Sequence, residues 1–563
     1  MSKRSINALF LASLMSFSVL LSSCSAVKTD DSQETLTAPP ASEPPVVTSH
    51  DPNVPDNLLG SETPSNSSEP PVESSTEPSS SEQQTEPSGS DNHSGMIVDD
   101  WSENLDLSKN DPAAIYDSYG IDKSLRDGFY TKICSETEFP VIHISTKNNA
   151  EILSRDEYVD CFVEVMNCDT VYQLEASEGG IRVRGNASAN YGNVDWIRQN
   201  PVSYRIKFNE KQSMLGLNDF AKCRSWVLLK PYETAIRNHL AFRLAKAINN
   251  GDYYTSDSIF VQLYINEEYL GPYQLCEQTQ ENSNRVDINE APEGYTGTDI
   301  GYLVELDNYA TSDDDPYFFL NFNLEEITDA YGTSRVPRKY SYSVKNDLYS
   351  DEQLKFIERY FEVAYEIALR AIKYGEFYTY DENYDLVPAQ DMFSSAYECV
   401  NAVFDVNSVV DMYILYEIVN DQDLGGGSFF FAVDFGEDPK YERLTMVAPW
   451  DFDWGYTDNN SKADGGLYAA KFKDSYFIDT LNLGDRSNPW LILFYSADWF
   501  KELVRQKWKA RLDSINAALD EVEDLVVNYS DEFNKDGERR SGRAKTTLDW
   551  TRDRVEYLGT IWG

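Results

Sequence analysis

A change of composition near residue 98 restricts what this chain can fold into more than any other feature. Residues 25–98 hold 11 of the 23 prolines, and thirteen acidic residues against a single lysine, Lys28. Such a segment cannot bury enough apolar surface to offset the entropy of ordering it, and its prolines and like charges keep it extended. We therefore expect a disordered stalk over residues 25–98 and a folded body after it.

The first residues are typical of an export signal. Lys3 and Arg4 precede an apolar run that ends in Leu21-Ser22-Ser23-Cys24, a small-residue cleavage site. This tetrapeptide resembles the bacterial lipobox, which implies cleavage before Cys24 and diacylation of its thiol. We predict a signal peptide over residues 1–24 and an extracytoplasmic protein anchored to the bacterial cell membrane through the Cys24 lipid. The alternative is an ordinary signal peptide in which the cysteine is incidental.

Charge and cysteine usage exclude several classes of protein. A net charge of −47 repels phosphate backbones, so nucleic acid is excluded as a general partner. No Cys-x-x-Cys occurs, and the four histidines have no zinc spacing. Only His143 and His239 lie in the body, neither beside a nucleophile motif. Cys161 and Cys168 either form a disulfide or remain buried free thiols, and the sequence does not set an oligomeric state.

Hydrophobic periodicity predicts an α+β protein. In the first half we expect strands and one prominent helix, in the segments 139–175, 181–184, 203–208, 235–248 (the helix) and 259–275. In the second half we expect a helix with Asp351 as its N-cap and Gly375 as its stop, and three further helices, at 408–419, 497–528 and 543–559. Two strands, 428–435 and 443–447, form a hairpin embedded among these helices. After a lead-in segment at 99–137, residues 138–563 would form one domain.

Acidic residues without basic partners flank this hairpin. Asp423 lies in the loop before its first strand, Ser428 follows five residues later, and Asp451-Phe452-Asp453 follows the return strand. Protein kinases have a similar order: a catalytic-loop Asp, a metal-binding Asn five residues later, two short strands, then Asp-Phe-Gly. Solvated turn acids are the simpler interpretation in so acidic a chain. Two acidic loops joined by a hairpin and flanked by Trp450 and Trp454 favour a shared site.

Several short motifs resemble the CotH-type family, the spore coat protein H-like atypical kinases. They occur in the family's order over about residues 138–560: 184–188 (RGNAS), 201–208, 226–229, 236–238, 269–273, the Asp423 loop and 450–453. The resemblance implies a divergent protein-kinase-like two-lobe fold, with a β-rich first lobe and a mainly helical second lobe. It also implies transfer of the γ-phosphoryl group of ATP to Ser or Thr of a protein substrate, with Mg²⁺ or Mn²⁺.

The same resemblance assigns roles around the two acidic loops. Asp423 would orient or deprotonate the acceptor hydroxyl, and Asp451 would hold the metal ion. Asp453, expected on the same side of an extended segment, would be a second metal ligand or a structural cap. Ser428 stands where many family members have a metal-binding Asn, and a hydroxyl is a poorer ligand.

Further assignments concern the phosphates. Lys207 would pair with the α- and β-phosphates, or be a plain surface lysine, and Glu277 would be its partner acid. Arg184 and Ser188 would line the phosphate side. Arg237-Asn238, at the start of a helix, would bind loops or phosphate.

Two other functions remain open. An exported protein meets little ATP, so a degenerate kinase fold that serves as a surface binding module is the first. A carbohydrate-active surface protein is the second, since paired carboxylates beside tryptophans also suit glycoside hydrolysis. The segment 376–407, rich in Tyr and Asp, is either a substrate-binding insert or a plain loop.

Overall fold

The structure, a computed structural model, covers most of the body of the chain. It describes residues 111–185, 189, 193–231, 236–307, 309–311, 315–322, 325–337, 339–456, 462–473 and 486–563. The predicted signal peptide with Cys24, the predicted stalk and Ser188 lie outside the described residues. Within the described residues, no helix is long and apolar enough to cross a membrane.

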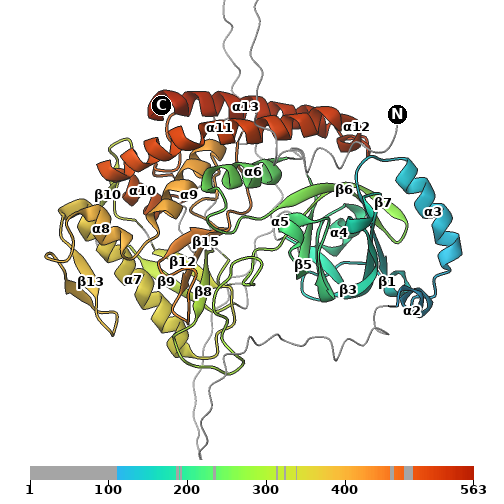
Figure 1. Cartoon of the computed structure of the whole chain (residues 1–563), viewed down its shortest axis with the longest axis horizontal. Coiled ribbons are helices and arrows are strands. Elements are labelled where there is room, and N and C mark those ends of the chain that lie inside the picture. Colours follow the sequence, from blue (N-terminus) through green and yellow to red (C-terminus); the bar gives the residue numbers. More distant parts are fainter. Residues whose placement is uncertain are drawn as a thin grey trace, which may run out of the picture. The chain divides into compact units, whose positions relative to one another are not determined.

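Seven strands of the first half close into a barrel (Figure 1). They are β1 (Val141–Thr146), β2 (Val159–Met166), β3 (Leu174–Arg184), β4 (Ser203–Gln212), β5 (Cys223–Leu229), β6 (Ser258–Ile265) and β7 (Glu268–Glu277). Their order around the barrel is β1-β2-β3-β4-β5-β7-β6, and a parallel pairing of β1 with β6 completes the circle. Alternate apolar residues, such as Ile142 and Ile144 of β1 and Ile206 of β4, fill the interior.

Two helices of the lead-in segment pack against the outside of this barrel. In α2 (Pro112–Ser118), Tyr116 meets the ring of Phe162 edge-on, with the ring centroids 5.5 Å apart. The carboxylate of Glu164 is buried there and accepts a hydrogen bond from Tyr116. Arg126 of α3 (Lys123–Ser135) lies 3.5 Å from the same carboxylate. The lead-in segment therefore contacts the barrel directly.

A second sheet lies in the other half of the molecule. Its five strands are β8 (Gly301–Leu306), β9 (Tyr317–Asn321), β12 (Lys339–Val344), β15 (Phe429–Asp434) and β16 (Thr445–Val447). The order is β16-β15-β8-β12-β9, so the predicted hairpin forms one edge of a larger sheet. Two small ribbons add β10 (Ile327–Thr328) with β11 (Ser334–Arg335) and β13 (Tyr378–Tyr380) with β14 (Leu386–Pro388).

Helices account for most of the rest. They are α4 (Val194–Gln199), α5 (Leu217–Phe220), α6 (Arg237–Asn249), α7 (Asp351–Tyr374), α8 (Ala396–Asn401), α9 (Val406–Val419), α10 (Pro489–Ser496), α11 (Asp498–Asn528), α12 (Ser530–Phe533) and α13 (Arg540–Trp562). The N-cap of α7 is Ser350 rather than Asp351, because Ser350 and Gln353 form a reciprocal capping box. Gly375 ends that helix in the left-handed conformation, as predicted.

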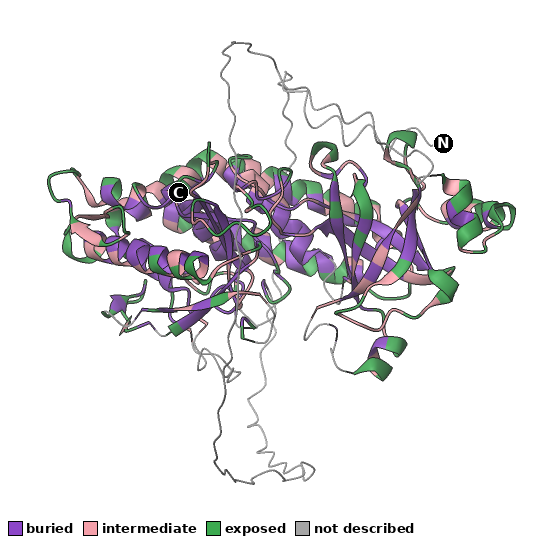
Figure 2. Ribbon diagram, turned by 90° about the horizontal axis from the view of Figure 1, so that it is seen from below, coloured by how far each residue is buried: buried purple, intermediate pink, exposed green. Residues whose placement is uncertain are grey.

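One apolar core joins the barrel to the helical half. It includes Val227 and Cys276 on the outer face of the barrel together with residues of α6, α7, α9 and α11. In Figure 2 the buried residues, coloured purple, lie along the helices and in both sheets. Helix α9 is buried on nearly every side, which fixes the loop that follows it. The α+β class is confirmed, whereas the closed barrel was not predicted.

Candidate functional site

The loop after α9 is folded tightly around its two aspartates. Asn420 ends the helix with a left-handed backbone, and its N–H bonds to the carbonyl of Tyr416. Asp421 is 2% exposed, and its Oδ1 accepts from the backbone N–H of Asp423 at 3.1 Å. The N–H groups of Gly426 and Gly427 donate to the carbonyl oxygen of Asp423 at 2.7 and 3.1 Å.

The loop after β16 is held by the start of α6. Asn238 accepts from the N–H of Phe452 at 2.7 Å and donates to Asp453 Oδ1 at 2.9 Å. Arg237 donates to the carbonyl oxygen of Asp453. This pair therefore binds a loop, one of the two roles expected for it. Asp451 has φ = +62°, so the segment is not extended as predicted, and such strained backbone is often found at functional sites.

The two loops touch each other. The N–H of Tyr456 donates to the carbonyl oxygen of Val419 at 2.5 Å, and the N–H of Gln422 donates to the carbonyl oxygen of Trp454 at 3.5 Å. Gly455 fits between them because a Cβ there would lie 2.9 Å from the Val419 carbonyl oxygen. These contacts bring Asp421 into the electrostatic range of Asp451 and Asp453.

All three carboxyl groups have a raised pKa, first because of burial. Burial, and then the charge of Asp451, raises the pKa of Asp421 well above its usual value. The same two causes raise the pKa of Asp453 to about 7, and burial raises the pKa of Asp451. Asp451 and Asp453 keep solvent-exposed surface, although the surrounding protein withdraws water from their carboxyl groups. The cluster is thus a concentration of negative charge that solvent can reach.

Three cations, Arg184, Arg237 and Lys473, offset part of this charge, and Arg237 lowers the pKa of both Asp421 and Asp453. Arg184 lies over the ring of Trp450, 5.1 Å from its centroid, and lowers the pKa of Asp451. Lys473 lowers the pKa of Asp421. Arg184 was predicted to line the phosphate side, and that role stays a prediction. Asp421 and Lys473 were missed: Asp421 could have been found from its place two residues before Asp423, whereas no sequence signal marks Lys473.

Asp423 has a partner that the sequence did not reveal. Arg486, just before α10, forms an ion pair with its carboxylate and lies over the ring of Trp454, 5.6 Å from the centroid. The side chain of Asp423 is 34% exposed and that of Arg486 is 17% exposed.

Lys207 and Glu277 do not form the predicted pair. Lys207 is exposed and makes no ion pair within the described part of the chain. Glu277 is fully buried, lies 3.7 Å from Arg285 and accepts from the N–H of Asp257 at 3.1 Å. The reason is the position of Glu277 at the end of β7, opposite Trp226 of β5, where Arg285 covers it.

Arginines, and not Lys207, form the partly buried cationic group on this face of the barrel. Arg182 of β3 lies directly opposite Arg205 of β4. Burial lowers the pKa of Arg205, and the nearby charges of Arg182, Arg184 and Arg285 lower it further. The Nε atoms of Arg182 and Arg205 are buried and have no hydrogen-bond partner among the described residues. This arrangement suits an anion.

Ser428 is tied to the second sheet. Its N–H donates to Oε1 of Glu305 at 3.0 Å, and it has φ = +56°. Glu305 in turn pairs with Lys345 at 2.9 Å.

The acidic cluster could hold Mg²⁺ through two carboxylates, although it is not a closed metal site. Within the described residues, no three His, Cys, Asp or Glu side chains form a metal cage. Mg²⁺, however, is commonly bound by one or two carboxylates and by substrate phosphates. Asp451 and Asp453 supply two carboxylates whose mutual repulsion a cation would relieve.

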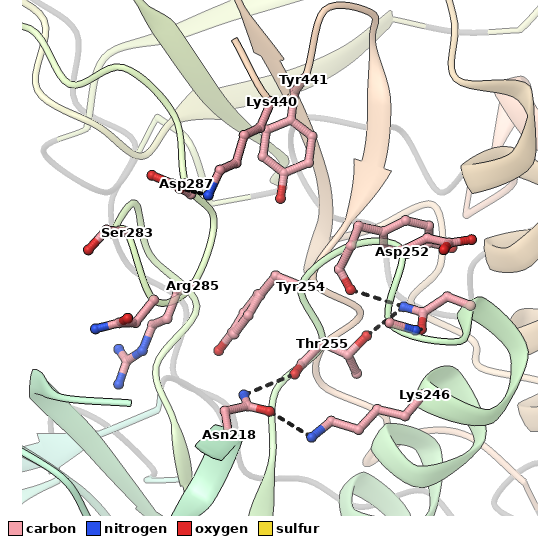
Figure 3. A pocket seen from close by; sticks show the side chains of 14 residues that line it. Asn218, Lys246, Asp252, Tyr254, Thr255, Ser283, Arg285, Asp287, Lys440 and Tyr441 are labelled. Carbon is pink, nitrogen blue, oxygen red and sulfur yellow. Dashed lines mark hydrogen bonds and ion pairs between the residues drawn. The ribbon is translucent and has the colours of Figure 1, made fainter. Parts of the chain in front are cut away.

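A separate cavity of about 520 Å³ lies beyond the end of α6 (Figure 3). Its lining includes Asn218, which accepts from Lys246 at 2.7 Å and donates to the carbonyl oxygen of Thr255 at 3.3 Å. The three cations that line it already have acidic partners: Lys246 pairs with Asp257, Lys440 with Asp287 and Arg285 with Glu277. None of the three clustered aspartates lines this cavity.

The six cysteines at 134, 161, 168, 223, 276 and 399 are all free thiols. The alternative of a disulfide between Cys161 and Cys168 is therefore wrong.

Comparisons with known proteins give one strong result. The model of the CotH kinase protein family matches residues 181–559. A search of the curated proteins finds no match. Among solved structures, a chain in the complex of HipA, HipB and its operator DNA, a toxin–antitoxin system of Shewanella oneidensis MR-1, is similar at 12% identity and a TM-score of 0.22. That match covers 60% of this chain and 61% of the other, and so slight a likeness supports no argument.

The family match includes both acidic loops, the end of β3 with Arg184, the whole of β4 with Arg205, and the helix that begins at Arg237. The chain belongs to the CotH kinase family.

Proposed function

We propose that this protein is an atypical protein kinase that transfers the γ-phosphoryl group of ATP to Ser or Thr hydroxyls of a protein substrate. The observation that carries the proposal is the cluster of Asp421, Asp451 and Asp453 beside Arg184, in a chain of the CotH kinase family. Buried like charges are costly, and they persist mainly where a function uses them. In this proposal the barrel and the helical half are the two lobes of a divergent kinase-like fold.

Each residue has a proposed role. Asp451 and Asp453 hold Mg²⁺ or Mn²⁺, which neutralises phosphate charge when bound. Arg184 and Arg205 bind the phosphates, because the buried Nε atoms of Arg205 and its neighbour Arg182 have no hydrogen-bond partner among the described residues, whereas Lys207 faces solvent. Asp423 orients the acceptor hydroxyl and takes its proton. Ser428 is a weak additional metal ligand at most, since its backbone is bound to Glu305.

The setting of the reaction is also a proposal. We infer from the sequence of residues 1–24 that Cys24 carries a lipid and that the catalytic body lies outside the bacterial cell membrane, on the stalk of residues 25–98. The nucleotide would then come from a local source.

The test is phosphoryl transfer by the full-length protein in detergent, with Mg²⁺ and γ-labelled ATP, to itself and to a Ser-rich acceptor. Asp423→Asn and Asp451→Asn should each lower transfer at least about 100-fold. Arg205→Gln should weaken binding of ATP, whereas the matched surface change Lys207→Gln should not. If the parent protein neither binds nucleotide nor transfers label, the kinase proposal is wrong. A binding module would then be the better description, and a polysaccharide pull-down would separate a carbohydrate-binding module from other kinds.

A further inference from the structure

The loop that carries Asp423 contains no positive charge. Its sequence from Asn420 to Ser428 is NDQDLGGGS. Phosphoryl transfer concentrates negative charge on the oxygens of the transferring group, and catalysis consists largely of positioning and stabilising that charge. If the loop takes part in such a reaction, a cation close to Asp423 must come from another part of the chain.

Arg486 has the position that such a cation needs. Its guanidinium forms an ion pair with the Asp423 carboxylate, and the face of Trp454 supports it from another side. Its side chain is 17% exposed, so it is largely withdrawn from bulk water yet still reachable. A guanidinium has five N–H donors, and one carboxylate leaves several of them for a second anion.

The backbone at Arg486 is fixed against the loop. A Cβ on Gly425 would lie 2.2 Å from the carbonyl oxygen of Ser487 and 2.5 Å from that of Arg486, so only glycine allows this close approach. Asn488 donates to the carbonyl of Leu424 at 2.9 Å, and Tyr340 donates to the carbonyl of Ser487 at 2.8 Å. Arg486 is therefore held at the loop before any substrate binds.

We propose that Arg486 is a catalytic residue that stabilises the transferring phosphoryl group; this inference rests on the proposed kinase function. The acceptor hydroxyl oxygen forms a bond to the γ-phosphorus. The bond from that phosphorus to the bridging β–γ oxygen breaks, and its electron pair stays on the ADP oxygen. The hydroxyl proton passes to the Asp423 carboxylate. Arg486 holds Asp423 in place with one N–H group and donates others to the γ-phosphoryl oxygens.

Two other roles for the ion pair lead to opposite results. If Arg486 blocks Asp423 and must leave before the acceptor enters, its removal increases turnover. If the pair is only structural, its removal changes stability and leaves the kinetics of the folded protein unchanged. The catalytic role alone predicts a loss of turnover together with a loss of affinity for a transition-state mimic.

The experiment compares the full-length parent with Arg486→Gln and Arg486→Lys, and with Arg505→Gln as control. Arg505 is an arginine of α11 whose one ion pair within the described part of the chain is with Glu502, three residues away on the same helix. We expect Arg486→Gln to lower kcat about 100- to 1,000-fold while the KM for ATP stays within about threefold. Arg486→Lys should retain an intermediate kcat, and guanidinium ion added to Arg486→Gln should restore part of it. Arg505→Gln should match the parent.

A binding measurement gives a readout apart from turnover. The parent should bind ADP with Mg²⁺ and aluminium fluoride, a mimic of the transferring phosphoryl, more tightly than ADP with Mg²⁺ alone. Arg486→Gln should lose this preference and keep its affinity for ADP. If Arg486→Gln does not fold, as judged by its thermal melting, Arg486→Lys carries the same comparison with a smaller expected loss.

The outcomes separate the two proposals. An active parent whose Arg486 variants have unchanged or higher kcat overturns the role of Arg486 and leaves the kinase proposal intact. An unchanged preference for the aluminium fluoride complex also overturns it. A parent that neither transfers phosphate nor binds nucleotide overturns both proposals together.

Discussion

Two buried acids, Glu417 and Asp421, lie at the end of helix α9, and their surroundings differ. Glu417 and Arg554 are both fully buried and pair at 2.9 Å. Glu417 also accepts from the N–H groups of Tyr468 and Ala469, and Arg554 donates to the carbonyl oxygens of Glu417, Ala463 and Gly466. Asp421 lies four residues beyond Glu417. The charges of two further aspartates raise its pKa, and the nearby cations offset this effect only in part.

The difference separates structure from function. A buried charge whose hydrogen bonds are complete stabilises one conformation, and loss of a single partner is costly. A buried cluster of like charge lowers stability, and a cation or a substrate that binds there recovers the loss. Because Glu417 and Asp421 are only four residues apart, the same chemical change, carboxylate to amide, can be made at each and the results compared.

The largest effect is expected from Glu417→Gln. This change leaves the Arg554 guanidinium buried without a counter-charge, so the free energy of unfolding should fall by about 3–5 kcal/mol. Urea unfolding followed by tryptophan fluorescence measures it. The double variant Glu417→Gln/Arg554→Met should recover part of the loss, and a loss below about 1 kcal/mol in the single variant would contradict the comparison.

A pH effect of intermediate size is expected from the pair in the barrel, Glu277 and Arg285. Burial raises the pKa of Glu277 to about 7, although Arg285 lowers it in part. A folded-state pKa above the unfolded value of 4.5 means that the folded protein binds the proton more tightly. The contribution of this residue to stability is therefore greatest below about pH 4.5 and decreases until about pH 7, by up to about 3 kcal/mol.

Glu277→Gln should remove this decrease, because the amide stays neutral at every pH. The measurement is urea unfolding of parent and variant at pH 5 and pH 8. The difference between their free energies of unfolding should change between those pH values. A constant difference would show that Glu277 is ionised in the folded protein at both.

A smaller effect of opposite sign is expected from Asp421→Asn. The amide cannot take on the charge that Asp451 and Asp453 oppose, and it keeps an oxygen that can accept from the Asp423 N–H. The free energy of unfolding should stay level or rise by about 1 kcal/mol, whereas Glu417→Gln lowers it. The same unfolding assay applies, and a loss as large as that of Glu417→Gln would show that Asp421 is part of the structural framework.

No resolvable change is expected from Glu151→Gln. Glu151 pairs with Arg198 at 2.8 Å, but both side chains are exposed and water screens them. Its unfolding midpoint should equal that of the parent, and a clear shift would show that exposed pairs matter more here than the comparison assumes.

The sequence predicted the parts of the fold that have local signals. The helices now seen as α7, α9 and α11 were expected within about two residues of their observed ends. In α7 the apolar residues repeat at the helical period, which is a local signal, whereas α9 is buried on nearly every side and lacks such a one-sided pattern. Closure of the barrel was not predicted, because the pairing of β1 with β6 joins strands over a hundred residues apart and leaves no local pattern.

The site was predicted in part for similar reasons. Asp423, Asp451 and Asp453 follow a recognisable order along the chain. Whether Lys207 or Arg205 is covered by protein depends on the neighbouring strands, because both side chains point to the same face of β4. Lys207 lies opposite Gly180 and Ser225, two small residues that leave it exposed. Arg205 lies opposite Arg182. Arg486 is distant from Asp423 in sequence and meets it only in the folded protein.

The parallel pairing of β1 with β6, which closes the barrel, also sets an order of events during folding. Strand β1 is the first strand to be synthesised, yet β6, one of the two strands that pair with it, begins only at Ser258. Contacts between such distant segments slow folding, and until they form, β1 presents an open edge to other chains. We therefore expect folding to be limited by the arrival of β6 and β7, and fragments that stop before Ser258 to aggregate through the exposed edges of an unfinished sheet.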